Sequence, residues 1–436
     1  MSLKANFPII AATFLSHFFT FGPIYSCGVF VPPLKAYFRT SLDAAATAHS
    51  LMIGFQFIGS LVAGLLIPRK LNHRSVNVLG ALVVLAGYSG ASFASSIELV
   101  YGSLGMLVGM GLGACNMAAL TALNCRITTD RALAVGIATS GTSVATILLP
   151  PIYTSCLEAT GWRWSLRINA ISTFVVLLAI TPVLDGRVNQ ASTAAAAQKK
   201  RCIPCGDARY LCWFLNMVIV FLGYFAPVTL LAEFVKEVLQ GSPSTAARMY
   251  TIIGVCSFSS RITLGCLTRR CGGSRIVHFG AQTANGFLVI VFPCCWNIET
   301  LTIWCACYGF TVGPVIALIS VILSELFGTD VLPLYHGYSR LAVGVGTFAG
   351  PPFIAYLAES RSYYFACAVA GSTILAGGCF LLLLAWLQHR HQQLDHHRNQ
   401  QRKHQLGTES LQETHQTDIA ESDNSNALSH VSTCTV

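Results

Sequence analysis

Arg261 is the residue in this chain whose type and position point most directly to chemistry. It lies in the middle of an apolar run at 247–267, and no apolar run of the chain holds an Asp or Glu at its middle. If this run crosses a bilayer, a lone arginine at mid-depth costs at least about 2.5–3.5 kcal/mol, so it must face a wet cavity. A guanidinium pairs with a carboxylate through two parallel hydrogen bonds. The sequence therefore favours Arg261 as a binding group for an organic anion, over an arginine that bonds backbone carbonyls and joins helices.

Other polar side chains in the apolar runs are candidates for the same cavity, although polar groups in membrane helices also serve to join helices. The next candidates for substrate contact are Tyr25, Tyr224, Ser257 and Asn116. His17 is the candidate proton carrier, because histidine titrates near physiological pH; the plainer alternative is a histidine hydrogen-bonded inside the helix bundle. Arg340 opens the run at 335–358, where a long side chain can reach the membrane surface.

Enzymatic constellations do not occur in these runs. They hold no paired carboxylates, no nucleophile beside a base and no cluster of metal ligands. Cys202 and Cys205 form a single Cys-x-x-Cys pair, whereas a structural zinc site needs four ligands. We therefore expect a protein that is not an enzyme and that needs no metal or cofactor.

The composition places these residues in a membrane. Of the 436 residues, 53% are hydrophobic and 10% are charged, whereas a soluble domain carries about 25% charged residues. Runs of about 20 apolar residues can cross a bilayer as helices, and the runs here are continuously apolar, unlike the alternating strands of a membrane β-barrel. We predict an all-α membrane protein whose twelve spans lie near 7–31, 44–67, 76–96, 99–123, 132–154, 165–184, 210–232, 247–267, 275–294, 300–323, 335–358 and 363–387.

The basic residues carry an orientation signal. The net charge is +9, and the loops after even-numbered spans hold about twice as many Lys and Arg as the other loops. Cytoplasmic loops are enriched in these residues, so we place the even-numbered loops and both termini in the cytoplasm. No nucleic-acid partner is expected, because the positive charge forms no continuous basic face.

A polar, basic segment divides the spans into two sets of six. We predict an N-terminal six-helix half at 1–184, a cytoplasmic central loop at 185–209, a C-terminal six-helix half at 210–388 and a disordered cytoplasmic tail at 389–436. Two such halves are common in secondary transporters, which bind substrate near the membrane midplane between them. A channel would instead show repeated pore loops or rings of like charge.

Each half has a basic turn after its second span. The turn at 64–74 contains Arg69, and the turn at 265–275 contains Arg269. Both resemble the signature of the major facilitator superfamily, with another residue in the place of its usual Asp; positive-inside anchoring is the alternative. The resemblance implies the major facilitator fold and a conformational role for Arg69 and Arg269.

A closer resemblance begins at the fifth span. Residues 131–143 read Arg-Ala-Leu-Ala-Val-Gly-Ile-Ala-Thr-Ser-Gly-Thr-Ser and resemble the fifth-helix signature of the monocarboxylate transporter family, solute carrier family 16. Small residues at helical spacing let helices approach closely, and prolines bend them. The segments that agree further with the family are 26–30, 161–163, 308–310 and 350–352. Conformational roles are assigned on this basis to Arg131, Gly136, Gly141 and Pro351.

The resemblance also implies a function. In this family an arginine at the place of Arg261 binds the substrate carboxylate. Proton-coupled members carry an Asp one turn earlier and a Lys in the first helix, where this chain has Ser257 and Tyr25. We expect a secondary transporter that moves small, monocarboxylate-like organic anions by alternating access, through facilitated diffusion or exchange. The alternatives are a proton-coupled symporter with a different proton carrier and a non-transporting sensor or scaffold on the same fold.

The expected partners follow from this function. They are a small organic anion, the lipid bilayer and, as the resemblance implies, a single-span ancillary glycoprotein. The expected location is the plasma membrane.

Overall fold

The structure is a computed structural model, and it describes residues 6–40, 42–67, 71–127, 130–184 and 207–386. By its contacts the chain forms one compact unit, Met1–Leu381, and a second, Leu382–Val436. Apart from the bounds of the last helix, everything below concerns the first unit. Residues 68–70 of the basic turn, Arg69 among them, nearly all of the central loop and the predicted disordered tail lie outside the described residues.

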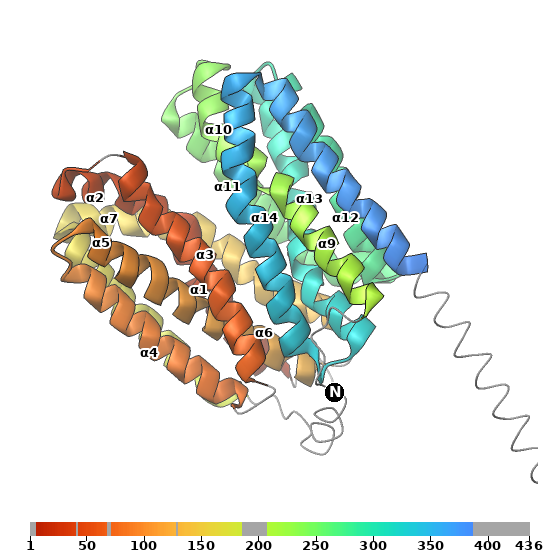
Figure 1. Cartoon of the computed structure of the whole chain (residues 1–436), viewed down its shortest axis with the longest axis horizontal. Coiled ribbons are helices and arrows are strands. Elements are labelled where there is room, and N and C mark those ends of the chain that lie inside the picture. Colours follow the sequence, from red (N-terminus) through yellow and green to blue (C-terminus); the bar gives the residue numbers. More distant parts are fainter. Residues whose placement is uncertain (1–5, 41, 68–70, 128–129, 185–206, 387–436) are drawn as a thin grey trace, which may run out of the picture. The chain divides into compact units, whose positions relative to one another are not determined.

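The described part of the chain consists of helices and connecting turns, without strands (Figure 1). We call the helices before residue 185 the first-half helices. They are α1 (Phe7–Ser26), η2 (Cys27–Phe30), α2 (Val31–Phe38), α3 (Leu42–Leu66), α4 (His73–Ser92), α5 (Ile97–Val100), η3 (Tyr101–Val108), α6 (Gly109–Arg126), α7 (Arg131–Ile180) and η4 (Thr181–Val183).

The helices after residue 206 are the second-half helices. They are α9 (Ala208–Tyr224), α10 (Ala226–Glu237), α11 (Pro243–Arg270), α12 (Ser274–Val291), η6 (Phe292–Cys294), α13 (Ile298–Phe327), α14 (Leu332–Ser360) and a last helix, Tyr363–Trp386. Between the two sets, α7 packs against α11 and α3 packs against α14.

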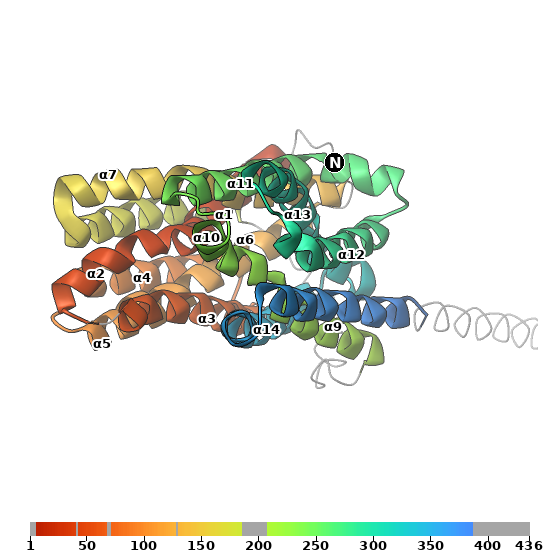
Figure 2. The same cartoon turned by 90° about the horizontal axis from the view of Figure 1, so that it is seen from above.

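Eleven helical segments of the described chain are long and apolar enough to cross a membrane. One of them, Arg131–Val183, has 53 residues, which amounts to about 80 Å of helix against about 30 Å of hydrocarbon. Its backbone leaves the helical region at Gly161, with φ 76° and ψ 168°, and Figure 2 shows α7 turning back on itself there. This segment therefore accounts for two predicted spans, and the prediction of an all-α protein with twelve spans is confirmed.

The first long helix of each half is interrupted, although the sequence suggests uninterrupted spans. The predicted span 7–31 is divided into α1, which contains Pro23, the 3-10 segment η2 and the start of α2. The predicted span 210–232 is divided at Phe225 into α9 and α10, and α10 has a proline in its first turn. Proline removes a backbone hydrogen bond and restrains the residue before it. Broken helices at membrane depth are tolerated where they line a cavity, and both breaks adjoin the cavity described below.

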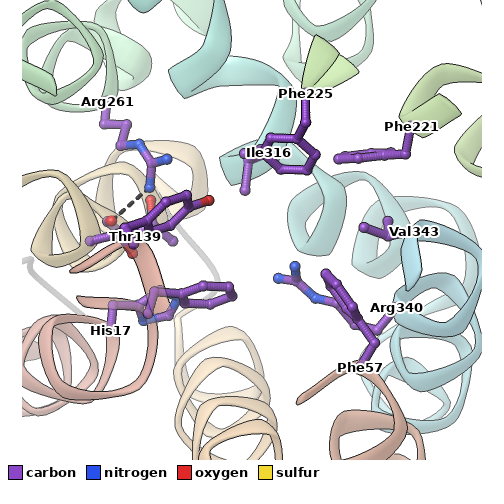
Figure 3. A pocket seen from close by; sticks show the side chains of 12 residues that line it. His17, Phe57, Thr139, Phe221, Phe225, Arg261, Ile316, Arg340 and Val343 are labelled. Carbon is purple, nitrogen blue, oxygen red and sulfur yellow. Dashed lines mark hydrogen bonds between the residues drawn. The ribbon is translucent and has the colours of Figure 1, made fainter. Parts of the chain in front are cut away.

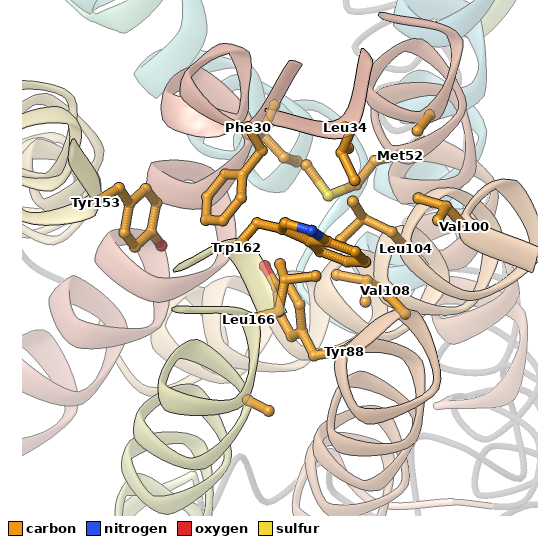
Figure 4. Close-up of a cluster of buried hydrophobic side chains, with 14 of the residues drawn as sticks. Phe30, Leu34, Met52, Tyr88, Val100, Leu104, Val108, Tyr153, Trp162 and Leu166 are labelled. Carbon is orange, nitrogen blue, oxygen red and sulfur yellow. The ribbon is translucent and has the colours of Figure 1, made fainter. Parts of the chain in front are cut away.

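Trp162 organises the core of the first-half helices. It lies one residue after the turn at Gly161, where a positive φ favours glycine, and its indole packs among Phe30, Leu104 and Leu166 (Figure 4). The guanidinium of Arg163 lies 5.0 Å from the Trp162 ring centroid and 4.9 Å from that of Tyr37. The Gly-Trp-Arg segment thus fixes the hairpin within α7 and joins it to α2.

Candidate functional site

The central cavity lies between first-half and second-half helices. Its volume is about 530 Å³, and α1 and α7 line one side while α9, α10, α11 and α13 line the other. Both broken helices contribute, through Tyr25 at the end of α1 and through Tyr224 and Phe225 where α9 meets α10. The site is therefore assembled from residues more than 200 positions apart in the chain.

Arg261 lies at the inner end of this cavity, as the sequence predicts for a charged residue in the middle of a span. Its side chain is 4% exposed, and its Nη1 donates a hydrogen bond of 2.7 Å to the carbonyl oxygen of Thr139 on α7. Its Nε–H has no hydrogen-bond partner in the structure. A nearly buried cation with a free N–H can donate a further hydrogen bond to an acceptor atom of a ligand.

A close contact of α7 with α11 fixes the backbone at Arg261. A Cβ on Gly136 would collide with the carbonyl oxygen of Arg261, so only glycine permits this approach. Gly141, five residues on, meets the carbonyl oxygen of Phe14 on α1 in the same way. Both predicted conformational glycines therefore lie at helix contacts, and Gly136 joins the two halves beside the arginine.

A smaller pocket of about 40 Å³ adjoins the cavity at Arg261 (Figure 3). Its walls include Tyr25, Phe225 and Ile316, which also line the larger cavity, and it extends to His17 on α1 and Arg340 on α14. Apart from Arg261 and Arg340, most of the surface of this pocket is made up of aromatic and aliphatic side chains.

Arg340 corrects the expectation that its side chain reaches the membrane surface. It is 5% exposed, its Nε donates a hydrogen bond of 3.1 Å to Nε2 of His336, and its guanidinium carbon lies 5.8 Å from the ring centroid of Phe21. The expectation was wrong because α14 begins at Leu332, three residues before the predicted span. Arg340 is therefore more than two helical turns from the helix end, at about 1.5 Å per residue. The missed signal is Pro333, which suits the first turn of a helix.

His17 is buried, and hydrogen bonds engage both of its ring nitrogens. Nδ1 lies 2.9 Å from the carbonyl oxygen of Thr13, and the amide nitrogen of Asn116 lies 3.2 Å from Nε2. A carbonyl needs a donor and an amide NH₂ needs an acceptor, so this pair of bonds fits the neutral imidazole with its proton on Nδ1. Asn116 itself does not line either pocket, since its side chain is turned to His17 and Thr20.

Two predicted tyrosines lie at the cavity in different settings. Tyr25 is 39% exposed, and its ring stacks on Phe21 at a centroid distance of 6.4 Å. Tyr224 is 1% exposed, and its hydroxyl donates a hydrogen bond of 3.0 Å to the carbonyl oxygen of Val312. Tyr308 in turn donates to the carbonyl oxygen of Tyr224 at 2.7 Å. The hydroxyl proton of Tyr224 is thus engaged in holding α9 to α13.

Ser257 lies on the cavity wall one turn before Arg261. Its Oγ accepts a hydrogen bond of 3.4 Å from the hydroxyl of Ser143 on α7. The structure therefore brings Arg261, Tyr25, Tyr224 and Ser257 together around one cavity. It places His17 beside the smaller pocket and Asn116 behind His17.

The helix ends nearest residues 127–130 and 328–331 are held together. Arg131 donates a hydrogen bond of 2.7 Å from Nη1 to the hydroxyl of Ser324, and Arg269 forms a salt bridge of 3.6 Å with Asp130. On the other side of the bundle, α3 meets α14 at Gly64 and Gly337: a Cβ added to Gly337 would lie 3.3 Å from the Cα of Gly64, and one added to Gly64 would collide with the carbonyl oxygen of Pro333. First-half and second-half helices are thus in direct contact at this end.

The remaining predicted residues are less fully placed. Pro351 lies inside α14, but the structure does not describe its side chain, and Arg69 lies outside the described residues. Within the described ranges, no group of three or more His, Cys, Asp and Glu side chains is arranged to hold a metal ion.

The comparisons with known proteins agree with this architecture. The sequence model of the Major Facilitator Superfamily matches residues 13–280 and 213–416. The protein is therefore a multi-pass membrane transporter that acts on small substrates. It belongs to the major facilitator superfamily, whose members are transporters, and the prediction that it is not an enzyme is thereby confirmed.

Its relatives by sequence include several monocarboxylate transporters. It is 26% identical over 381 residues to monocarboxylate transporter 13 of Rattus norvegicus, a match that covers 86% of this chain and 88% of that protein. It is 25% identical to monocarboxylate transporter 12 of Mus musculus, covering 82% and 80% of the two chains. For monocarboxylate transporter 10 of Homo sapiens the identity is 26%, and the coverage is 85% and 76%. The predicted resemblance to this family is confirmed, at the distance of a divergent member.

Solved structures agree on the fold. The human organic anion transporter MFSD10 superposes with a TM-score of 0.69 at 14% identity, covering 87% of this chain and 100% of that one. The proton:xylose symporter XylE superposes with a TM-score of 0.65 at 16% identity, covering 88% and 96%. At these identities the likeness establishes the fold alone.

Proposed function

We propose that the protein is a secondary transporter that moves small organic anions across the membrane by alternating access. One observation carries the proposal: Arg261 lies nearly buried at the inner end of a 530 Å³ cavity with a donor that no protein group engages. A carboxylate at this point would accept from the guanidinium through two parallel bonds. The relatives named as monocarboxylate transporters make a carboxylate the first choice of anion.

The electrostatics of the cavity support an anionic substrate. Among its described lining residues there is no Asp or Glu, so the charge of Arg261 has no counterion there. An uncompensated charge in a low-dielectric interior opposes closure of the cavity around it. A bound anion would neutralise Arg261 and so lower the barrier to reorientation of the halves.

The contacts between the halves suggest how that reorientation would occur. The cavity extends from Arg261 toward the first turns of α11, near Ala247, whereas Arg131 and Arg269 hold the opposite helix ends together. We propose that these two arginines form contacts of one transport state that break as the other forms. Gly136 and Gly141 would act as the close contacts along which α7 moves, and Pro351 as a bend in α14.

The proposed mode is facilitated diffusion or exchange. In the cavity, Ser257 and Tyr25 occupy the places at which the family resemblance implies an acidic and a basic group in proton-coupled members. His17, the alternative carrier, holds two hydrogen bonds that fit its neutral form. A protonated His17 would have to give up the bond from Asn116, which opposes a shuttle role.

The test is uptake from a mixed pool of organic acids, amino acids and amines, measured by mass spectrometry in cells that express the wild type or Arg261→Gln at equal surface level. We expect carboxylates to accumulate with the wild type and uptake to fall at least about 100-fold in the variant, because a buried charged pair would be lost. An imposed proton gradient should leave uptake unchanged.

Matched variants make this test specific. Arg261→Lys keeps the charge but loses the two-pronged geometry, so partial uptake is expected. Arg126→Gln removes an arginine whose side chain is exposed, away from the cavity, and should transport like the wild type. Full uptake by Arg261→Gln would show that Arg261 only joins helices, and no uptake of any solute by the wild type would favour a sensor or scaffold.

For location and partners, we propose the plasma membrane, cytoplasmic termini and escort by a single-span glycoprotein. The support is the asymmetry of Lys and Arg between loops and the kinship with monocarboxylate transporters. Surface biotinylation tests the location, and mass spectrometry of proteins that copurify with the chain tests the glycoprotein partner. Recovery from internal membranes only would contradict the location.

A further inference from the structure

The smaller pocket brings a second buried cation to the substrate cavity. Arg261 on α11 and Arg340 on α14 both line it, and Figure 3 shows the guanidinium of Arg340 directed toward the middle of the pocket and that of Arg261 on the facing side, bonded to Thr139. They are 4% and 5% exposed. Their spacing in the sequence does not indicate that they share a pocket, because they lie on separate helices of the second half.

Neither arginine has an acidic partner in the part of the chain that the structure describes. Salt bridges in that part include those of Arg209 with Asp207 and of Arg269 with Asp130, and neither involves Arg261 or Arg340. The partners of Arg261 and Arg340 are a carbonyl oxygen and a histidine nitrogen, both uncharged. The described walls of the two pockets include no Asp or Glu. The joined cavity therefore carries two positive charges and no fixed negative one.

A single carboxylate would balance only half of this charge. Bound to Arg261, it would leave Arg340 as an uncompensated buried cation, which remains costly. A substrate with two anionic groups would pair with both guanidiniums and would leave the closed cavity neutral. The pocket that both arginines line is also lined by Phe21, Phe225, Ile316 and Val343, and an apolar wall of this kind suits a carbon skeleton that separates two charged ends.

We propose that the substrate is a small dianion, of the dicarboxylate class, with one carboxylate at Arg261 and the other at Arg340. The proposal rests on the proposed function, transport of organic anions, and narrows its substrate class. Arg340 is assigned as the residue that selects two charges over one. Its position depends on His336, which accepts from Nε and leaves the two terminal nitrogens of the guanidinium directed to the pocket.

The experiment compares pairs of acids with the same carbon skeleton. Purified full-length protein in liposomes takes up radiolabelled succinate or butyrate, glutarate or valerate, and phthalate or benzoate, at pH 7.4. We expect the dianion of at least one pair to be preferred over its monoanion by tenfold or more in initial rate. This measurement uses the unaltered protein, so it does not depend on whether any variant folds.

Variants then assign the preference to Arg340. Arg340→Gln should lower the ratio of dianion to monoanion uptake at least tenfold, and Arg340→Lys should retain most of the preference. Arg126→Gln, an exposed arginine, should leave the ratio unchanged. Thermal unfolding of each purified variant identifies any that fails to fold.

The outcomes separate this proposal from the proposed function. Uptake of monoanions with the dianions excluded, or an unchanged ratio in folded Arg340→Gln, would overturn the dianion proposal and leave anion transport standing. Monoanions that bind two at a time, seen as a sigmoidal dependence of rate on butyrate concentration, would also overturn it. Uptake of no acid from any pair would overturn both.

Discussion

At the scale of single residues, the polar side chains of the cavity divide by whether the protein already engages them. Arg261 keeps one donor free, whereas Tyr224 donates a hydrogen bond to the carbonyl oxygen of Val312 and His17 uses both ring nitrogens. A side chain with a free donor or acceptor can bind a ligand, and one that is engaged mainly holds helices. The sequence could identify which types of residue were available, but not which of them were engaged.

Two tyrosine substitutions should separate these roles. Tyr224→Phe removes the side-chain hydrogen bond to the Val312 carbonyl, so we expect a loss of stability of about 0.5–1.5 kcal/mol and a lower Tm, with little change in KM. Tyr25→Phe removes a hydroxyl from an exposed ring at the cavity, so we expect an altered KM and an unchanged Tm. Measuring both quantities for both variants provides the control, and the reverse pattern would contradict the assignment.

Arg261 and Arg340 show how well the sequence pattern predicts the depth of a charged side chain in the membrane. Arg261 was identified correctly as a mid-span charge because its run is apolar for many residues on each side. Arg340 was misplaced because a shift of three residues in a helix start changes the depth of a side chain by about 5 Å. Which residues share a cavity depends on contacts between distant helices, and no local pattern contains that information.

At the scale of helices, backbone contacts determine where the halves meet. Apolar length predicted the spans well, because about 20 residues must cross a fixed thickness. It could not reveal the breaks at Cys27–Phe30 and Phe225, since the residues on both sides of each break are equally apolar. The glycines of α7 were recognised as small, but their particular partners, Arg261 and Phe14, became known only from the packing.

Gly136→Ala should test the close contact between α7 and α11. The added methyl group would collide with the Arg261 carbonyl oxygen and push the helices apart, so we expect lower Tm and uptake reduced at least tenfold. Gly54→Ala is the matched control, because nothing lies within 4 Å of its Cβ position and alanine favours helix. Equal behaviour of the two variants in unfolding and uptake assays would show that the close contact between α7 and α11 is not needed for transport.

At the scale of the whole molecule, the structure is one state of a protein that must have at least two. The superfamily and its fold could be predicted from motifs and from the number of spans. The contacts that hold the helix ends near Arg131 and Arg269 together, which we call the closed end, could not be predicted, because the same helices and the same sequence must serve both states. Contacts such as those of Arg131 and Arg269 become visible only when one state is observed.

Arg131→Ala should weaken that closed end, since it removes the bond to Ser324. Cys125 lies at this end and is half-buried, with its thiol 3.8 Å from the Thr329 carbonyl oxygen. We expect a membrane-permeable maleimide to label Cys125 several-fold faster in the variant, as read by mass spectrometry. Cys271 is exposed in the structure and serves as the internal reference. An unchanged labelling ratio would mean that Arg131 does not hold the ends together.

The hairpin tip at Gly161 has a practical consequence. Residues 158–161 are exposed, and no atom lies within 4 Å of the Cβ position of Gly161, so a short epitope inserted before it would displace no packed group. An antibody applied to intact cells would bind this epitope only if the tip faces the outside. Because the two arms of α7 cross the bilayer in opposite directions, that single staining result would assign the sidedness of every other loop.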